Sequence, residues 1–184
     1  MAPKNIRLIL AFDGAAYCGW QIQKNQPTIQ GTVSEAASRI TGETVRLTGS
    51  GRTDAGTHAR GLVANFRTRS RIAPEKLVPA LNSILPRDIR VLSARRVPLD
   101  FHARRDARAK VYRYQIYLGP ILLPHMRREF FHFPFPVDLQ RMEEAAGCFL
   151  GEHDFASFAK SPPKPNTIRR ISRCDLKKSA TGCF

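Results

Sequence analysis

The chain has 184 residues, of which 42% are hydrophobic and 24% are charged, a balance typical of a globular protein. This length is enough for one large domain or two small ones. No apolar run approaches the roughly 20 residues of a membrane-spanning helix, and the N-terminus lacks the apolar segment of a secretory signal. We therefore expect a cytoplasmic protein without a membrane partner.

The charge balance is strongly basic. Thirty Lys and Arg residues against fifteen Asp and Glu give a net charge of +15. Because so many positive charges repel one another in the compact state, such an excess usually indicates binding to an anionic partner. Nucleic acid is the first candidate, since released counterions supply much of its binding free energy. A generally basic proteome is the alternative explanation.

The first predicted elements are a strand, a helix and a second strand. Apolar side chains alternate over residues 6–12, with the period of a half-buried strand. Thr32 and Glu35 have the spacing of a capping box, and apolar residues then recur with helical spacing as far as Gly42. The short run 45–47 is expected to form the second strand.

Beyond a glycine-rich loop, the pattern continues with a strand, a helix and a strand. Residues 62–66 alternate, Pro74 suits the first turn of a helix whose apolar face ends at Ile84, and residues 89–97 complete the unit. The order β-α-β-β-α-β is the ferredoxin-like split motif. This motif buries two helices on one sheet face and leaves the other free, the face that RNA-binding domains of this shape use.

From about residue 106 the pattern begins again with fewer elements. Residues 111–117 are a β-rich run, Asp138 can cap a helix that ends by Gly151, and residues 168–176 are expected to form a strand. The second half therefore supplies only β-α-β.

These elements predict an α+β protein in two halves. Residues 1–105 form a ferredoxin-like, RRM-like half that carries the glycine-rich loop 49–58, and residues 106–184 form an incomplete half of similar type. The four cysteines are scattered and the five histidines lack zinc-ligand spacing, so we expect no metal site.

The loop 49–58 holds three glycines, one arginine and one carboxylate. Glycines allow close backbone approach to a ligand and positive φ angles. Arg52 could bind a phosphate or the polar groups of a nucleotide, while Asp54 faces a reacting centre. Alternatively, Asp54 closes an Asx-type turn on its own backbone. The residues alone favour neither interpretation.

Residues 51–59, Gly-Arg-Thr-Asp-Ala-Gly-Thr-His-Ala, resemble the catalytic signature of the tRNA pseudouridine synthase A family. Further blocks resemble that family in the same order, namely 17–21 (Tyr-Cys-Gly-Trp-Gln), 101–104 followed by 112–114 (Phe-His-Ala-Arg and Tyr-Arg-Tyr), and 151–158 (Gly-Glu-His-Asp-Phe-Ala-Ser-Phe). The resemblance covers residues 6–176 and implies a pseudouridine synthase fold.

The resemblance implies an isomerase that breaks the N1–C1′ bond of a uridine in tRNA, rotates the uracil and rejoins it through C5, without a cofactor. By motif match, Asp54 is the catalytic carboxylate. Arg52 would hold the displaced nucleotide or fill the vacated space, and Tyr112 would stack on the uracil. A core or cross-strand position is the alternative for Tyr112. His58 and His102 are expected to be loop or packing residues.

The resemblance also implies a C-terminal block with a Met-Val-Arg-type motif, and nothing after Lys178 resembles it. We therefore expect a C-terminally truncated form, with activity left open, and a homodimer where the C-terminal half is complete. The expected target is the anticodon stem-loop. The alternative is a catalytically silent, basic RNA-binding fragment. In both cases the partner is tRNA, whose backbone would follow a cluster of basic residues: Arg95, Arg96, Arg104, Arg105, Arg108, Lys110 and Arg113.

Overall fold

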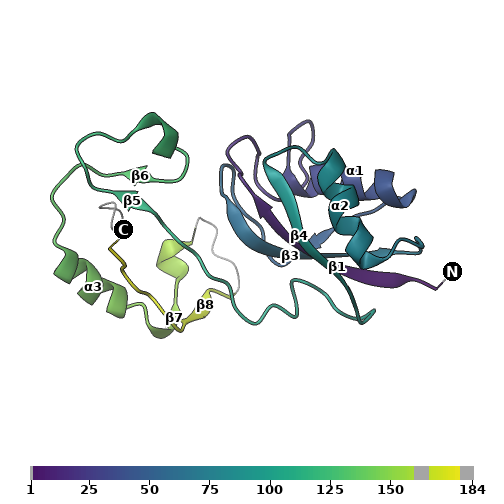
Figure 1. Cartoon of the computed structure of the whole chain (residues 1–184). Coiled ribbons are helices and arrows are strands. Elements are labelled where there is room, and N and C mark those ends of the chain that lie inside the picture. Colours follow the sequence, from purple (N-terminus) through teal and green to yellow (C-terminus); the bar gives the residue numbers. More distant parts are fainter. Residues whose placement is uncertain (1, 160–165, 179–184) are drawn as a thin grey trace. The chain divides into compact units, whose positions relative to one another are not determined.

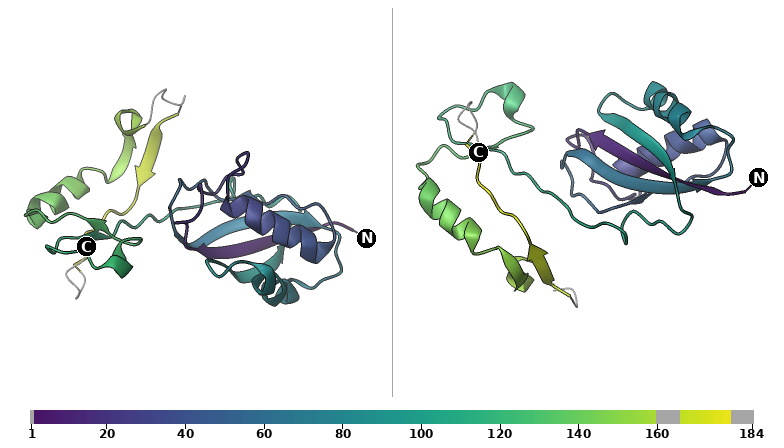
Figure 2. Two further views of the ribbon diagram at one scale, coloured as in Figure 1. Left: turned by 90° about the horizontal axis from the view of Figure 1, so that it is seen from above. Right: turned by 60° about the horizontal axis from the view of Figure 1, so that its bottom comes forward.

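The computed structural model describes residues 2–159 and 166–178 of the chain. They form two compact units, Met1–Lys110 and Val111–Phe184, each of which is described by itself (Figures 1 and 2). The stretch after Lys178, which bears on the expected truncation, lies outside the described residues. None of the described helices is long and apolar enough to cross a membrane.

The first unit contains six elements in the predicted order, namely β1 (Lys4–Phe12), α1 (Ile29–Thr41), β2 (Thr48–Gly49), β3 (Ala59–Thr68), α2 (Pro74–Ile84) and β4 (Ile89–Val97). Hydrogen bonding places the strands in the order β2-β3-β1-β4, with every neighbouring pair antiparallel. This is the ferredoxin-like arrangement, and it confirms the predicted α+β class.

The core of this unit lies between the sheet and the two helices, which pack on one sheet face (Figure 2). Alternate residues of β1 from Ile6 to Phe12 are buried, as the strand period requires. They meet Val33 and Ala37 of α1 and Leu77 of α2 in one cluster. Full burial of one such aliphatic side chain contributes about 2 kcal/mol, so this layer holds the sheet firmly.

Helix α1 begins one turn earlier than the sequence predicts, so the capping box placed at Thr32 is wrong. The N-cap is Thr28, whose hydroxyl oxygen accepts a hydrogen bond from the Gly31 N–H at 3.3 Å. Thr32 lies inside the helix, and its own hydroxyl donates to the Thr28 carbonyl at 3.0 Å. The earlier start is favourable because it brings Ile29 into the core, where its side chain is fully buried.

The second strand lies further along the chain than predicted, at Thr48–Gly49 instead of 45–47. The backbone N–H of Val45 donates to the Ser38 hydroxyl at 2.9 Å, and that of Leu47 donates to the Ser34 hydroxyl at 3.2 Å. Two serines of α1 therefore take the place of a strand partner in this run.

The sheet face opposite the helices is partly covered, whereas the sequence predicts it to be free. The buried Asn5 side chain donates to the carbonyls of Pro98 (3.0 Å) and Phe101 (2.8 Å). Asn65 donates to the Asn5 side-chain oxygen at 3.0 Å and accepts from the Ala103 N–H at 2.9 Å. These bonds hold the chain after β4 across this face.

The second unit contains short elements: β5 (Ile116–Tyr117), a 3₁₀ turn (Pro124–Met126), β6 (Phe131–His132), α3 (Leu139–Gly147), β7 (Gly151–Asp154), a second 3₁₀ turn (Ala156–Phe158) and β8 (Ile168–Ile171). Strand β5 pairs with β6 in parallel, and β7 pairs with β8 in antiparallel fashion.

Asp138 caps α3 as predicted, its carboxylate accepting from the Arg141 N–H at 3.1 Å. The strands expected over 111–117 and 168–176 are both shorter than predicted, since only the ends named above are paired. Among the described apolar residues of this unit, only Ala146 is buried. Strands need a buried apolar face to be stable, so the small apolar burial in this unit explains why its strands are short.

Candidate active site

The glycine-rich loop joins β2 to β3 at the edge of the first unit's sheet. Gly49 pairs with Ala64, and the Ser50 N–H donates to the carbonyl of Val63 at 2.7 Å, so the loop leaves the sheet after Ser50. The side chains of Arg52 and Asp54 are both exposed. A short loop therefore presents one guanidinium and one carboxylate to solvent.

Backbone hydrogen bonds hold Asp54 against the segment that follows β1. The Trp20 N–H donates to the Thr53 carbonyl at 3.1 Å, and the Gly56 N–H donates to the Tyr17 carbonyl at 3.2 Å. These two bonds bracket Asp54, so its backbone is fixed on both sides. A side chain on such a support is better positioned for chemistry than one on a free loop.

The turn at Asp54 uses its backbone carbonyl, which accepts from the Thr57 N–H at 3.2 Å. Over residues 2–159 and 166–178, no side-chain hydrogen bond of Asp54 is found. The Asx-type turn that the sequence left as an alternative is therefore not formed, and the carboxylate oxygens remain available to a ligand.

Two glycines make the close approach of the two segments possible. Gly19 has a φ of +84°, and a Cβ atom there would lie 2.3 Å from the Thr53 carbonyl oxygen. At Gly14, an added Cβ atom would lie 2.0 Å from the Thr57 carbonyl oxygen. Real carbon–oxygen contacts are never this short, so only glycine allows the observed packing at either position.

A buried tyrosine anchors the supporting segment to the sheet. Tyr17 is 8% exposed, and its hydroxyl donates to the Asp88 carboxylate at 2.8 Å. The Asp13 N–H donates to the Asp88 carbonyl at 2.9 Å, one residue before β4 begins. Burial, reinforced by the Asp88 carboxylate, raises the pKa of Tyr17 above its ordinary value.

We expect Tyr17→Phe to lower the free energy of unfolding by about 1–2 kcal/mol, because the half-buried Asp88 carboxylate loses its hydrogen-bond donor. The raised pKa adds a pH dependence. The folded state binds the phenolic proton more tightly, so this stabilisation is complete below pH ~10 and is lost as the pH rises further. Urea denaturation at pH 8 and pH 11 should show a smaller alkaline loss for Tyr17→Phe than for wild type.

The control for this measurement is Tyr114→Phe, because the Tyr114 side chain is 83% exposed. It should keep the wild-type stability at pH 8 and the wild-type loss at pH 11. If Tyr17→Phe behaved in the same way as Tyr114→Phe, the Tyr17–Asp88 bond would have no anchoring role.

Two more side chains lie at the ends of the loop. His58 Nδ1 lies 3.1 Å from Asp13 Oδ1, which also accepts from the Ala15 N–H at 2.9 Å. A Cβ atom added at Gly51 would lie 2.8 Å from Lys110 Nζ, so this ammonium lies against the start of the loop. Of the predicted basic cluster, Lys110 is thus placed beside the segment that carries Arg52.

Tyr112 lies in the second unit, outside any strand, with its side chain 72% exposed. The alternative of a core or cross-strand position for Tyr112 is therefore wrong. Arg52 and Asp54 both lie on the loop of the first unit, two residues apart in the chain. Among the residues the structure describes, no group of three or more His, Cys, Asp or Glu side chains could hold a metal ion.

Sequence reasoning missed the supporting residues Asp13, Gly14, Tyr17 and Asp88. Their contacts with the loop and with one another join positions tens of residues apart, which no local pattern reveals. The available signal was the resemblance of residues 17–21 to a family block, which did not say what that block contacts.

Comparison with known proteins defines the class of this fold and loop. Residues 8–106, which include the whole loop, match the profile of the tRNA pseudouridine synthase family. A tRNA pseudouridine synthase A of Caldicellulosiruptor saccharolyticus is 46% identical over 94% of this chain and 71% of its own length. Proteins of the same name from Citrifermentans bemidjiense (46%, over 98% and 72%) and a Thermoanaerobacter species (41%, over 96% and 72%) are also similar.

These matches place the chain among the pseudouridine synthases, which are isomerases. More narrowly, the chain belongs to the tRNA pseudouridine synthase A family.

Proposed function

We propose that this chain converts uridine to pseudouridine in tRNA, with Asp54 as its catalytic carboxylate. The observation that carries the proposal is the exposed Asp54 side chain on a loop whose backbone is hydrogen-bonded on both sides of it. Arg52, on the same loop, supplies a positive charge for a phosphate or for the displaced nucleotide.

The reaction balances without a co-reactant. The N1–C1′ bond of the uridine breaks, the uracil rotates, and a C5–C1′ bond forms. C5 gives up its proton and N1 gains one, so the product is an isomer of the substrate. The Asp54 carboxylate acts at C1′, either as a nucleophile or as a stabiliser of the cationic sugar.

The exposed position of Asp54 suits a nucleotide that leaves its base stack to reach the carboxylate. A uridine within a stacked helix hides its C1′ and C5 atoms, so the nucleotide has to leave the stack at a cost of a few kcal/mol. We propose that Tyr112 stacks on the freed uracil, which is worth about 1–3 kcal/mol per base. Arg52 holds the nucleotide that has been displaced.

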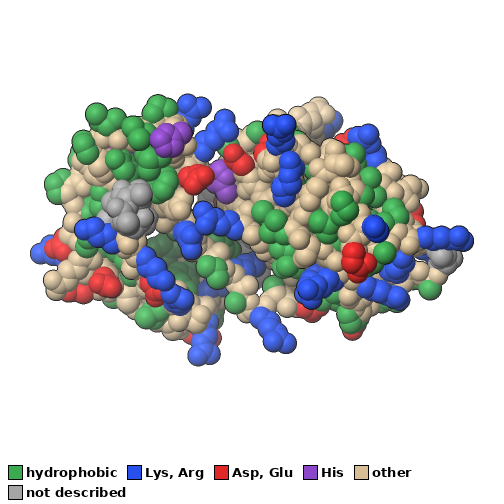
Figure 3. Space-filling view, in the orientation of Figure 1, with side chains coloured by type: hydrophobic (Ala, Val, Ile, Leu, Met, Phe, Trp, Pro, Cys, Tyr) green, Lys and Arg blue, Asp and Glu red, His purple; other side chains and the backbone are tan. Residues whose placement is uncertain are grey.

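Four further parts of the proposal concern the whole protein, namely its two halves, its location, its target and its oligomeric state. The N-terminal half, residues 1–105, carries the carboxylate, and the C-terminal half, residues 106–184, carries Tyr112. The enzyme acts in the cytoplasm on the anticodon stem-loop, and it works as a homodimer where the C-terminal half is complete. The net charge of +15 supports a polyanionic substrate, and Lys and Arg side chains are prominent on the face in Figure 3.

Release of tritium from tRNA labelled at C5 of uridine tests the proposal, because C5 loses its hydrogen when the new bond forms. We expect release that saturates with tRNA concentration. Salt-dependent tRNA binding without any release would contradict the proposal and support the alternative of a silent RNA-binding protein.

A further inference from the structure

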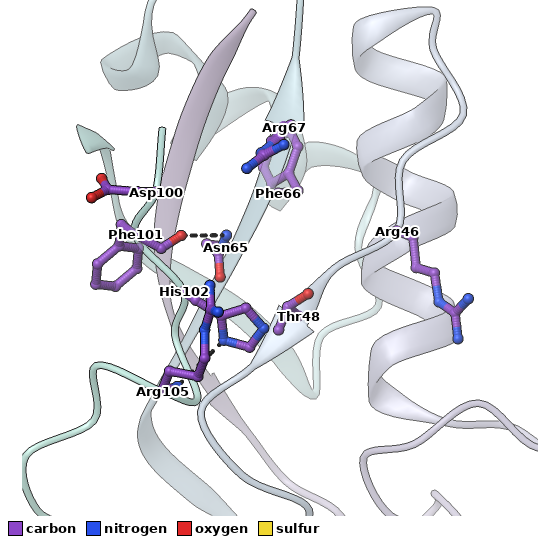
Figure 4. Close-up of a pocket in the computed structure, with 9 residues that line it drawn as sticks. All are labelled: Arg46, Thr48, Asn65, Phe66, Arg67, Asp100, Phe101, His102 and Arg105. Carbon is purple, nitrogen blue, oxygen red and sulfur yellow. Dashed lines mark hydrogen bonds between the residues drawn. The ribbon is translucent and has the colours of Figure 1, made fainter. Parts of the chain in front are cut away.

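The first unit contains a polar pocket of about 380 Å³ on the sheet face opposite the helices. It lies beside β2 and β3 and beneath the segment that follows β4 (Figure 4). The lining residues that matter most here are Arg46, Thr48, Asn65, Arg67, His102 and Arg105.

The pocket is built by the hydrogen bonds that hold the segment after β4 on the sheet. Asn65, which is 7% exposed, accepts from the Ala103 N–H at 2.9 Å. The His102 N–H donates to Asp106 Oδ2 at 2.8 Å, and the Asp106 N–H returns a bond to the His102 carbonyl at 3.0 Å. The turn that carries His102 and Arg105 is therefore fixed over the sheet.

The same turn sets the protonation pattern of the His102 ring. His102 Nδ1 lies 3.2 Å from the Arg104 N and 3.3 Å from the Arg105 N, and it accepts from both N–H groups. Because Nδ1 is an acceptor, the neutral ring carries its proton on Nε2. The pocket wall thus includes an imidazole N–H donor that is held in place by backbone bonds.

Charge in the pocket favours an anion. Arg46, Arg67 and Arg105 line it, opposed by the single carboxylate of Asp100. Arg67 uses one N–H to donate to the Leu99 carbonyl at 3.0 Å, which leaves its other donors available. Guanidinium groups match the oxygens of a phosphate and bind it through paired N–H groups.

The position of the pocket connects it with the loop. Thr48 lines the pocket, and Asp54 follows six residues later along the chain, so at most ~20 Å of extended backbone separates them. A stacked polynucleotide strand rises about 3.4 Å per nucleotide. One strand can therefore reach both places within about six nucleotides.

We propose that this pocket binds a backbone phosphate of the RNA, within a few nucleotides of the uridine that reaches Asp54. This inference rests on the proposed function for the choice of tRNA as the polynucleotide and for the uridine at Asp54. The anchoring contact is sequence-independent, since it recognises the phosphodiester and no base edge.

The test is the salt dependence of tRNA binding to the full chain carrying Arg46→Gln or Arg105→Gln. Removing one phosphate contact should reduce the slope of log K against log[salt] by about 0.7–0.9 and weaken binding about sixfold at 0.1 M salt. The control is Lys76→Gln, which also removes one exposed charge but lies on α2, across the sheet from the pocket. It should alter the affinity less than about twofold.

A second measurement identifies the source of the phosphate. In NMR spectra of the free protein, addition of tRNA should shift the His102 ring resonances at concentrations where the same amount of inorganic phosphate does not. If the pocket variants had the same tRNA affinity and salt slope as the Lys76→Gln control, the proposal would be overturned. If inorganic phosphate alone shifts His102 in that case, the pocket takes a free anion.

The binding assay and the activity assay test the two proposals separately. If the wild-type protein released no tritium, the proposed function would be contradicted. The pocket proposal would still be decided by the salt slope of tRNA binding to the pocket variants. If both hold, the pocket variants should raise KM and leave kcat within about twofold of wild type.

Discussion

Asp54→Asn should lower the rate of tritium release from C5-labelled tRNA at least ~10³-fold, or about 4 kcal/mol of transition-state stabilisation, while tRNA affinity stays within about threefold of wild type. The amide keeps the shape of the side chain but has no charge with which to attack or stabilise C1′. The fold should be unaffected, since the Asp54 side chain is exposed and the turn uses its backbone carbonyl.

Glu35→Gln is the matched control for this carboxylate-to-amide change. Glu35 is an exposed residue of α1, away from the loop between β2 and β3. This variant should release tritium at the wild-type rate. Residual activity above a tenth of wild type in Asp54→Asn would assign the chemistry to another group.

Gly19→Ala should reduce kcat about 10²-fold, because Gly19 packs against the backbone that carries Asp54. A Cβ atom at this position would lie 2.3 Å from the Thr53 carbonyl oxygen and 3.0 Å from the Asp54 carbonyl carbon. The loop has to move away, and a misplacement of about 1 Å in a catalytic group can cost 10²-fold. The same clash and the positive φ should lower the free energy of unfolding by about 2–4 kcal/mol.

Substitutions at two other glycines separate the effect of the clash from that of the positive φ. Gly42 also has a positive φ, +70°, but an added Cβ atom would meet nothing within 4 Å, so Gly42→Ala measures the backbone penalty alone. Gly61 lies in β3, where a Cβ atom would meet only Ile9 Cγ2 at 4.0 Å. Both variants should keep the wild-type kcat. A Gly19→Ala protein that does the same would show that the contact with Thr53 does not position Asp54.

Much of the first unit's fold could be predicted from the sequence because its signals are local. Helix α2 begins at Pro74 and β4 spans residues 89–97, both as the sequence predicts. The predictions failed where a distant group replaced a local one. Residues 45–47 bond to serine hydroxyls of α1, and Thr28 caps that helix because the extra turn buries Ile29.

The candidate site was predictable in part for the same reason. The composition of the loop singled out Arg52 and Asp54, since glycines beside a guanidinium and a carboxylate are a local pattern. The anchor formed by Tyr17 and Asp88 joins residues 71 positions apart, and the pocket lined by His102 depends on a turn held by Asn65. Such contacts arise from tertiary packing, which periodicity and spacing do not describe.

The nucleoside composition of tRNA before and after incubation with the protein tests the central claim most directly. We predict that pseudouridine rises and uridine falls by the same amount, at unchanged tRNA mass, with wild-type protein and not with Asp54→Asn. Equal composition before and after incubation with wild type, or equal conversion by both proteins, would contradict the account of Asp54 as the carboxylate of a tRNA pseudouridine synthase.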